Sequence, residues 1–198
     1  MNNKSYSRRK RFAVIVLASV LSLAFALVPQ AGVVGPGASL KPSTNGVTIY
    51  VSKINKTVTL QQNGVTIGTY PASMGENSGS GDKEVQGDRR TPSGSFYVCT
   101  RNDKSDYYLA LGVSYPSIPD ADRGYEAGII TEEERDSILK AIEKGETPPW
   151  DTALGGAIEI HGDRYPGGVT AGCIAVDNSV MDILWEYCQV GVPITIGP

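Results

Sequence analysis

The feature that most constrains the fold is a hairpin pattern early in the chain. Apolar and polar residues alternate from Val47 to Ser52, and two further β-rich runs follow at 57–60 and 65–70. A period of two is typical of a strand that buries one face. Asn63 and Gly64 separate the last two runs, and this dipeptide favours the tight turn between antiparallel strands. The pattern predicts that the folded part begins as an antiparallel sheet.

Later segments predict a mainly β domain with two helices. Residues 96–98, 107–113 and 157–161 have β character. The segment 131–145 begins with the capping box Thr-x-x-Glu, continues with apolar residues at helical spacing and ends at a glycine, so it predicts a helix. A second helix is expected over 178–190, with its apolar side chains facing inward.

The N-terminal composition predicts an export segment. Five cations precede an uncharged run from Phe12 to Val28, the layout of a secretion signal. The run has about 17 residues, near the lower limit for a membrane-spanning helix. Residues 1–28 are therefore either a signal peptide or an N-terminal membrane anchor.

The rest of the chain divides into a linker and one domain. Residues 29–45 are rich in Gly, Pro and Ser and are predicted to be a linker. Residues 46–198 then form the folded domain, with a partly helical insertion at about 114–155. That insertion either shapes a binding cleft or only covers the sheet.

Charge and residue usage argue against nucleic-acid and metal binding. The net charge is −3, and removing the five N-terminal cations leaves about −8, with no basic stripe. The chain has one histidine and neither a CxxC nor an HExxH motif. We therefore expect no metal and no cofactor.

Three cysteines raise a pairing question in an exported protein. An odd number leaves at least one thiol free. If Cys173 acts as a nucleophile it must stay reduced, and Cys99 and Cys188 are then either a disulfide or two buried thiols.

The only histidine, His161, precedes Cys173 by about a dozen residues. A thiol attacks a carbonyl carbon as thiolate, and a free cysteine, with a pKa of roughly 8.5, needs a base at neutral pH. His161 is the only imidazole that can serve. Gly172 lets the backbone turn tightly beside the sulfur, so the amides of Gly172 and Cys173 are candidates for an oxyanion hole. The alternative is a buried core thiol and a hydrogen-bonded strand histidine.

Four motifs favour the catalytic interpretation, because together they resemble the YkuD family of L,D-transpeptidases, cysteine enzymes of the bacterial cell wall. They are the His-Gly…Thr-x-Gly-Cys-Ile segment at 160–176, the opening hairpin at 47–71, the Thr-Pro-x-Gly-x-Phe block at 87–96 and the closing strand at 191–196. The resemblance spans about 150 residues. It implies a YkuD-like β-sandwich in which His161 is the base and the backbone carbonyl of Gly162 orients it.

The chain departs from the family pattern at two positions. Many members have a histidine directly before the Gly-Cys and an arginine two residues after the cysteine, where this chain has Ala171 and Ala175. The motif is closer to a variant subgroup with Thr-x-Gly-Cys-Ile-Ala. The missing arginine leaves open how the substrate is held.

Four residues that we expect around this centre are candidates for substrate binding. Arg164 either binds a stem-peptide carboxylate or is a solvated loop residue, and Tyr115 either lines the cleft or packs in a turn before Pro116. Tyr165 also lies near the motif, and the hydroxyl of Thr170 either contacts substrate or bonds the turn.

The resemblance implies acyl transfer on peptidoglycan stem peptides through a Cys173 thioester, in the periplasm or cell envelope. The alternatives are a hydrolase (a carboxypeptidase or an amidase) acting on stem peptides or on wall-linked proteins, and a non-catalytic wall-binding module. A thiol-disulfide oxidoreductase would need a second cysteine close to Cys173. We expect a monomer.

Overall fold

The computed structural model of the protein describes residues 45–198. The predicted export segment at 1–28 and the predicted linker at 29–45, apart from Asn45, lie outside the described residues. No helix within 45–198 combines the length and the apolar character needed to cross a membrane.

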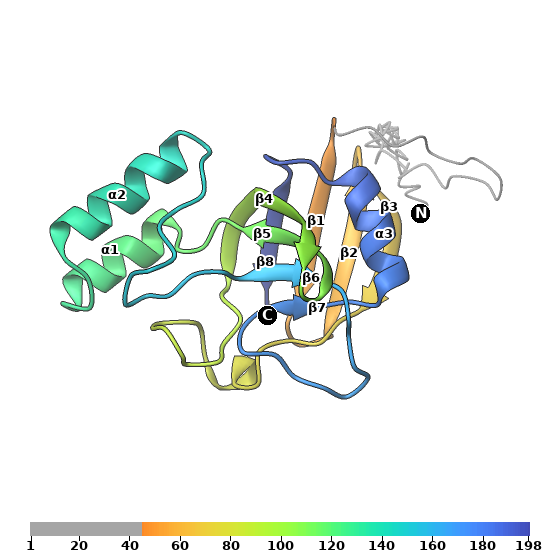
Figure 1. Ribbon diagram of the computed structural model, residues 1–198, viewed down its shortest axis with the longest axis horizontal. Coiled ribbons are helices and arrows are strands. Elements are labelled where there is room, and N and C mark those ends of the chain that lie inside the picture. The colour runs from red at the N-terminus through yellow and green to blue at the C-terminus, as the bar shows by residue number, and fades with distance from the viewer. Residues whose placement is uncertain (1–44) are drawn as a thin grey trace, which may run out of the picture. The chain divides into compact units, whose positions relative to one another are not determined.

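The described chain is mainly β, as the sequence predicts, and its eight strands form one curled sheet (Figure 1). The strands are β1 (Val47–Ser52), β2 (Thr57–Gln62), β3 (Val65–Pro71), β4 (Gly94–Ser105), β5 (Tyr108–Val113), β6 (Glu159–His161), β7 (Ile174–Ala175) and β8 (Pro193–Gly197). Their order in the sheet is β3-β2-β1-β8-β4-β5-β6-β7. β1 pairs with β8 in parallel, and β6 with β7 in parallel.

Strand β4 joins the two halves of the sheet. Its first residues pair with β8, and its later residues pair with β5. A register shift between Val98 and Thr100 lies at the start of the stretch that pairs with β5, and such bulges bend a strand. The main core draws buried side chains from both halves, among them Ile49, Leu111 and Ile174. The expected two-layered packing is thus made by one continuous sheet that folds over its own core.

The Asn63-Gly64 turn forms the predicted hairpin between β2 and β3. Both residues have positive φ, 51° and 76°. Two successive residues in the left-handed region are the requirement of a type I′ turn, and that turn matches the right-handed twist of the strands it joins.

Within residues 45–198, three α-helices accompany the sheet: α1 (Ile118–Glu126), α2 (Glu132–Glu143) and α3 (Asn178–Tyr187), with a short 3-10 turn η1 at Ser78–Ser80. Both predicted helices are present as α2 and α3. The capping box of α2 forms, with Thr131 and Glu134 bonding each other's backbone amides at 3.2 and 2.8 Å. Helix α3 packs against the sheet and supplies Met181 and Leu184 to the main core.

Helix α1 is an addition to the two helices that the sequence predicts. It begins with Ser117 and Asp120 as its capping box, and Gly124 lies in its interior. Glycine lowers helix propensity, and nine residues give little apolar periodicity. The sequence of this segment is therefore a weak signal for a helix. Helices α1 and α2 lie side by side beyond one end of the sheet (Figure 1) and enclose a second, smaller core that contains Ile138 and Leu154.

Candidate active site

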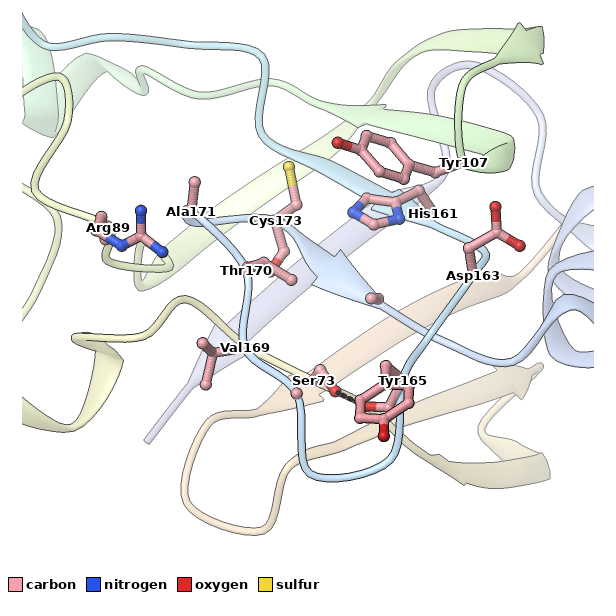
Figure 2. A pocket seen from close by; sticks show the side chains of 12 residues that line it. Ser73, Arg89, Tyr107, His161, Asp163, Tyr165, Val169, Thr170, Ala171 and Cys173 are labelled. Atoms are coloured by element: carbon pink, nitrogen blue, oxygen red, sulfur yellow. Dashed lines mark hydrogen bonds between the residues drawn. The ribbon is translucent and has the colours of Figure 1, made fainter.

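The parallel pairing of β6 with β7 brings the histidine and the cysteine together. His161 is the last residue of β6 and lies opposite Ala175, while Ile160 lies opposite Ile174. Cys173 is two residues before Ala175, so its side chain points to the same face as Ala175. The imidazole and the thiol therefore lie on one face of the sheet, and Figure 2 shows them bordering the same pocket.

The imidazole of His161 is almost fully buried, with 6% of the residue exposed. Its Nδ1 lies 2.8 Å from the carbonyl oxygen of Gly162. Because a carbonyl only accepts hydrogen bonds, Nδ1 carries the proton and Nε2 presents a lone pair. Burial lowers the pKa of His161, although the bond to Gly162 and the charge of Asp163 act in the opposite direction. The ring is therefore neutral at pH 7 and able to accept a proton.

Tyr107, at the tip of the β4–β5 hairpin, covers the imidazole. The two rings stack with centroids 4.6 Å apart and planes 29° from parallel. Gly162 makes this approach possible, since a Cβ there would lie 2.9 Å from the backbone oxygen of Tyr107 and 2.5 Å from the side chain of Asn178. The hairpin tip therefore restricts how the ring of His161 can move.

The surroundings of Cys173 favour the protonated form of its thiol. Its Sγ lies 3.5 Å from the carbonyl oxygen of Ala157, to which it donates. Burial raises the pKa of Cys173 to about 11, and a hydrogen bond from the Glu159 backbone offsets this only in part. At pH 7 about one molecule in ten thousand then holds a thiolate. Both groups of the pair are therefore neutral at pH 7.

The turn before Cys173 is held by the hydroxyl of Thr170. This hydroxyl donates to the carbonyl of Cys173 at 2.6 Å and accepts from the N–H of Gly172 at 3.1 Å. Gly172 has a φ of 140°, a conformation that favours glycine, and its carbonyl accepts from Thr91 at 2.9 Å. Because Thr170 already accepts from the Gly172 amide, the Cys173 amide is the better of the two candidate oxyanion donors.

A cavity of about 300 Å³ opens over the imidazole of His161 and the thiol of Cys173. His161, Cys173, Thr170 and Tyr165 line it, as Figure 2 shows, and Tyr165 is 78% exposed at its rim. The lining also includes four residues that are not among the candidates from the sequence: Ser73, Arg89, Tyr107 and Asp163. Arg89 and Asp163 lie within the motifs at 87–96 and 160–176, but nothing in those motifs indicates that their side chains line a cavity. The segment after β3, the β4–β5 hairpin and two loops bring the four residues together.

Two sequence-predicted substrate residues lie outside the cavity lining. Tyr115 is fully buried, stacks edge-on against Phe96 and donates its hydroxyl to the carbonyl of Leu154 at 3.2 Å. Arg164 pairs with Asp177 at 3.1 Å, with only 16% of its side chain exposed. Arg164 is thus a packed ion-pair residue, neither a pocket cation nor a solvated one.

The helical insertion also stays away from the cavity, since no residue from 114–155 lines it. The question about Cys99 and Cys188 is resolved in favour of two buried free thiols. Within residues 45–198, no three His, Cys, Asp or Glu side chains gather in a way that could hold a metal ion.

Comparison with protein-family models matches residues 46–196 to YkuD, the L,D-transpeptidase catalytic domain. Comparison with curated proteins finds no match. Among solved structures the chain is similar to Bd1075 of Bdellovibrio bacteriovorus, with 22% identity and a TM-score of 0.51 over 77% of this chain and 48% of that one. The chain is also similar to the helical cell shape determining protein Pgp2 of Campylobacter jejuni, with 22% identity and a TM-score of 0.51 over 77% of this chain and 47% of that one.

L,D-transpeptidase 1 of Mycobacterium tuberculosis is 17% identical, with a TM-score of 0.46 over 78% of this chain and 62% of that one. The chain thus spans between about half and three fifths of the length of these solved proteins. The two likenesses with a TM-score of 0.51 show a shared fold.

We expect the alkylation of Cys173 by iodoacetamide to rise about tenfold per pH unit from pH 7 to pH 10, because the thiolate reacts and the pKa of Cys173 is about 11. Peptide mass mapping at a series of pH values measures the rate. Cys173→Ala is the control, since Cys99 and Cys188 are buried. A plateau near neutral pH would show a preformed thiolate and contradict the prediction.

The chain's single histidine allows a direct test of the ring environment by NMR titration. His161 is expected to titrate below the usual value of about 6.5. Tyr107→Ala removes the stacked ring and should move the pKa of His161 upward, because the imidazole becomes better hydrated. Tyr107→Phe keeps the stack and should leave the pKa low. Equal titration of the wild type and both variants would show that Tyr107 does not shield the ring.

Proposed function

The chain belongs to the YkuD family of L,D-transpeptidase catalytic domains, and from this premise we propose that it is a cysteine acyltransferase acting on peptidoglycan stem peptides. One observation carries the proposal: the only histidine and Cys173 lie on one face of a parallel strand pair and line one cavity. A buried core thiol and an unrelated strand histidine would have no reason to share an opening to solvent.

In the first step, the Cys173 sulfur attacks the carbonyl carbon of an L-to-D peptide bond. Nε2 of His161 takes the thiol proton as the sulfur–carbon bond forms, which suits a pair that is neutral before substrate arrives. The Cys173 amide is our candidate donor to the oxyanion. When the intermediate collapses, His161 returns the proton to the departing amine, and the terminal D-amino acid leaves behind a thioester.

In the second step, an acceptor amine attacks the thioester carbonyl and His161 takes a proton from that amine. The carbon–sulfur bond breaks, the sulfur regains its proton, and a new amide cross-links two stem peptides. If water is the acceptor, the same step yields a trimmed peptide, which is the hydrolase alternative. Wall-linked proteins carrying an amine, or joined through such a bond, are further substrates of the same chemistry.

We assign supporting roles to four residues around this centre. The carbonyl of Gly162 holds the imidazole tautomer, and Gly172 with Thr170 shapes the turn that carries the sulfur. Tyr165, exposed at the rim, is the remaining candidate for contact with the peptide. Tyr115 and Arg164 are left out of substrate binding because their polar groups are used within the fold.

Substrates of this kind place the domain outside the cytoplasm. We propose that residues 1–28 direct export, as a signal peptide or an anchor, and that 29–45 link them to the catalytic domain at 46–198. The periplasm or cell envelope is then the working compartment, and one copy suffices because the described cavity is complete within a single chain.

Cys173→Ala and His161→Ala should each stop formation of the acyl-enzyme with a stem tetrapeptide or a carbapenem. Loss of the sulfur removes the bond-forming atom, and loss of the base is expected to slow acylation by about 10²–10⁴-fold. Intact-protein mass spectrometry measures the adduct, and circular dichroism checks the fold. Cys99→Ala is the matched thiol control and should acylate normally. Labelling of Cys173→Ala at the wild-type rate would exclude this cysteine as the nucleophile.

Product analysis separates transfer from hydrolysis. We expect wild-type protein incubated with a defined tetrapeptide muropeptide to form a dimer, detected by liquid chromatography and mass spectrometry. Dimer formation should grow with muropeptide concentration. The same muropeptide supplies the acceptor amine, and this amine competes with water for the thioester. Trimmed monomers alone at every concentration would favour the hydrolase.

A further inference from the structure

The cavity over His161 and Cys173 contains one cation for which the proposed reaction has no use. Among the described residues that line the cavity, Arg89 is the only lysine or arginine. Figure 2 shows its side chain extending toward Cys173 from the side opposite His161. Ala171 and Ala175, which also line the cavity, contribute only methyl groups. Positive charge at this wall therefore depends on Arg89.

The backbone holds Arg89 in a conformation that a residue with a side chain rarely adopts. Its φ is 60°, in the left-handed region. Such strain persists only where the surroundings over-determine it, and it is concentrated at functional sites. Here Asp88 supplies the restraint. Its carboxylate accepts hydrogen bonds from the buried ammonium of Lys83 and from the backbone amides of Glu84, Val85 and Arg90.

The guanidinium of Arg89 retains donors for a ligand. Its Nε forms an ion pair with Glu76, and both side chains are about half exposed, at 48% and 50%. Exposed pairs of this kind are weak, so Glu76 steadies the side chain without consuming its charge. The terminal Nη1 and Nη2 atoms remain able to donate. A planar fork of this geometry binds a carboxylate through two parallel hydrogen bonds.

The direction of attack decides which half of a substrate meets Arg89, and this step rests on the proposed function. His161 must reach the nitrogen of the departing D-amino acid to protonate it. The leaving residue therefore lies on the His161 side of the sulfur, and the acyl half of the peptide extends to the other side. Arg89 lies on that other side.

We propose that Arg89 determines donor specificity by binding a free carboxylate on the acyl half of the stem peptide, the half that stays on the enzyme as the thioester. The chemistry selects a donor whose third residue is a diamino dicarboxylic acid with its side-chain carboxylate unblocked. A donor with that carboxylate amidated, or with lysine at the same position, lacks the anion that Arg89 would bind.

The test compares two synthetic tetrapeptides that differ only in whether this carboxylate is free or amidated. The full chain and its variants are assayed for release of the terminal D-amino acid, and the ratio of kcat/KM for the two donors is the readout. Wild-type protein should prefer the free donor by about ten- to a hundredfold, as expected for a lost hydrogen bond to a charged group. Arg89→Gln should reduce that ratio to near one, and Arg89→Lys should retain part of it.

Two further variants make the outcome decisive. Lys140→Gln removes an exposed cation from α2 and should keep the wild-type ratio. Glu76→Gln keeps the guanidinium and removes its partner, so the preference for the free donor should stay or increase even if Arg89→Gln does not fold. Three results would each overturn the inference. They are an equal loss of kcat/KM for both donors in Arg89→Gln, a kcat/KM ratio near one in the wild type, and a reduced ratio in Glu76→Gln. Wild-type protein that cleaves neither donor, while Cys173 still alkylates, would instead overturn the proposed function and this inference with it.

Discussion

The parallel pairing of β6 with β7 is the constraint on which the candidate active site depends. Strand β6 has three residues and ends at His161, and strand β7 has two and begins directly after Cys173. After leaving β6, the chain must turn back so that β7 runs parallel to it. Parallel strands normally need a crossover of a dozen residues or more. Here the loop between them supplies that length, and its ends are fixed by side chains. Asn178 bonds Asp163 after the histidine, and Thr170 bonds the turn before the cysteine.

Burial then determines how the site is activated. The same low-polarity surroundings lower the pKa of His161 and raise the pKa of Cys173 to about 11, so both groups wait in their neutral forms. A thiolate held permanently next to imidazolium would attack sooner, but it would also oxidise more readily. A neutral thiol that is deprotonated only as it attacks is better protected from oxidation before a substrate arrives.

Much of the fold follows from local pattern, whereas much of the cavity does not. The hairpin around Asn63 and the capped helix α2 were predictable because their signals lie within a few residues of one another. Tyr107 and Arg89 line the cavity through loops that meet only after the sheet has closed, and no spacing in the sequence encodes that meeting. Tyr115 shows how a choice that the sequence leaves open is decided by packing. The residue before Pro116 could line the cleft or pack in a turn, and the structure buries its ring in the main core.

The helical insertion supports the site although none of its residues lines the cavity, and the buried ring of Tyr115 is part of this support. The ammonium of Lys83 lies over the Tyr115 ring, 5.7 Å from its centre, and pairs with Asp88 at 2.9 Å. Helix α1 reaches the same place, where Arg123 donates to the carbonyl of Lys83 at 3.0 Å. Breaking a buried ion pair typically costs about 3–5 kcal/mol, more than the 1–3 kcal/mol of a strained backbone residue. The insertion and this pair therefore hold the loop that presents Arg89, and the free energy of that packing offsets the strain at Arg89.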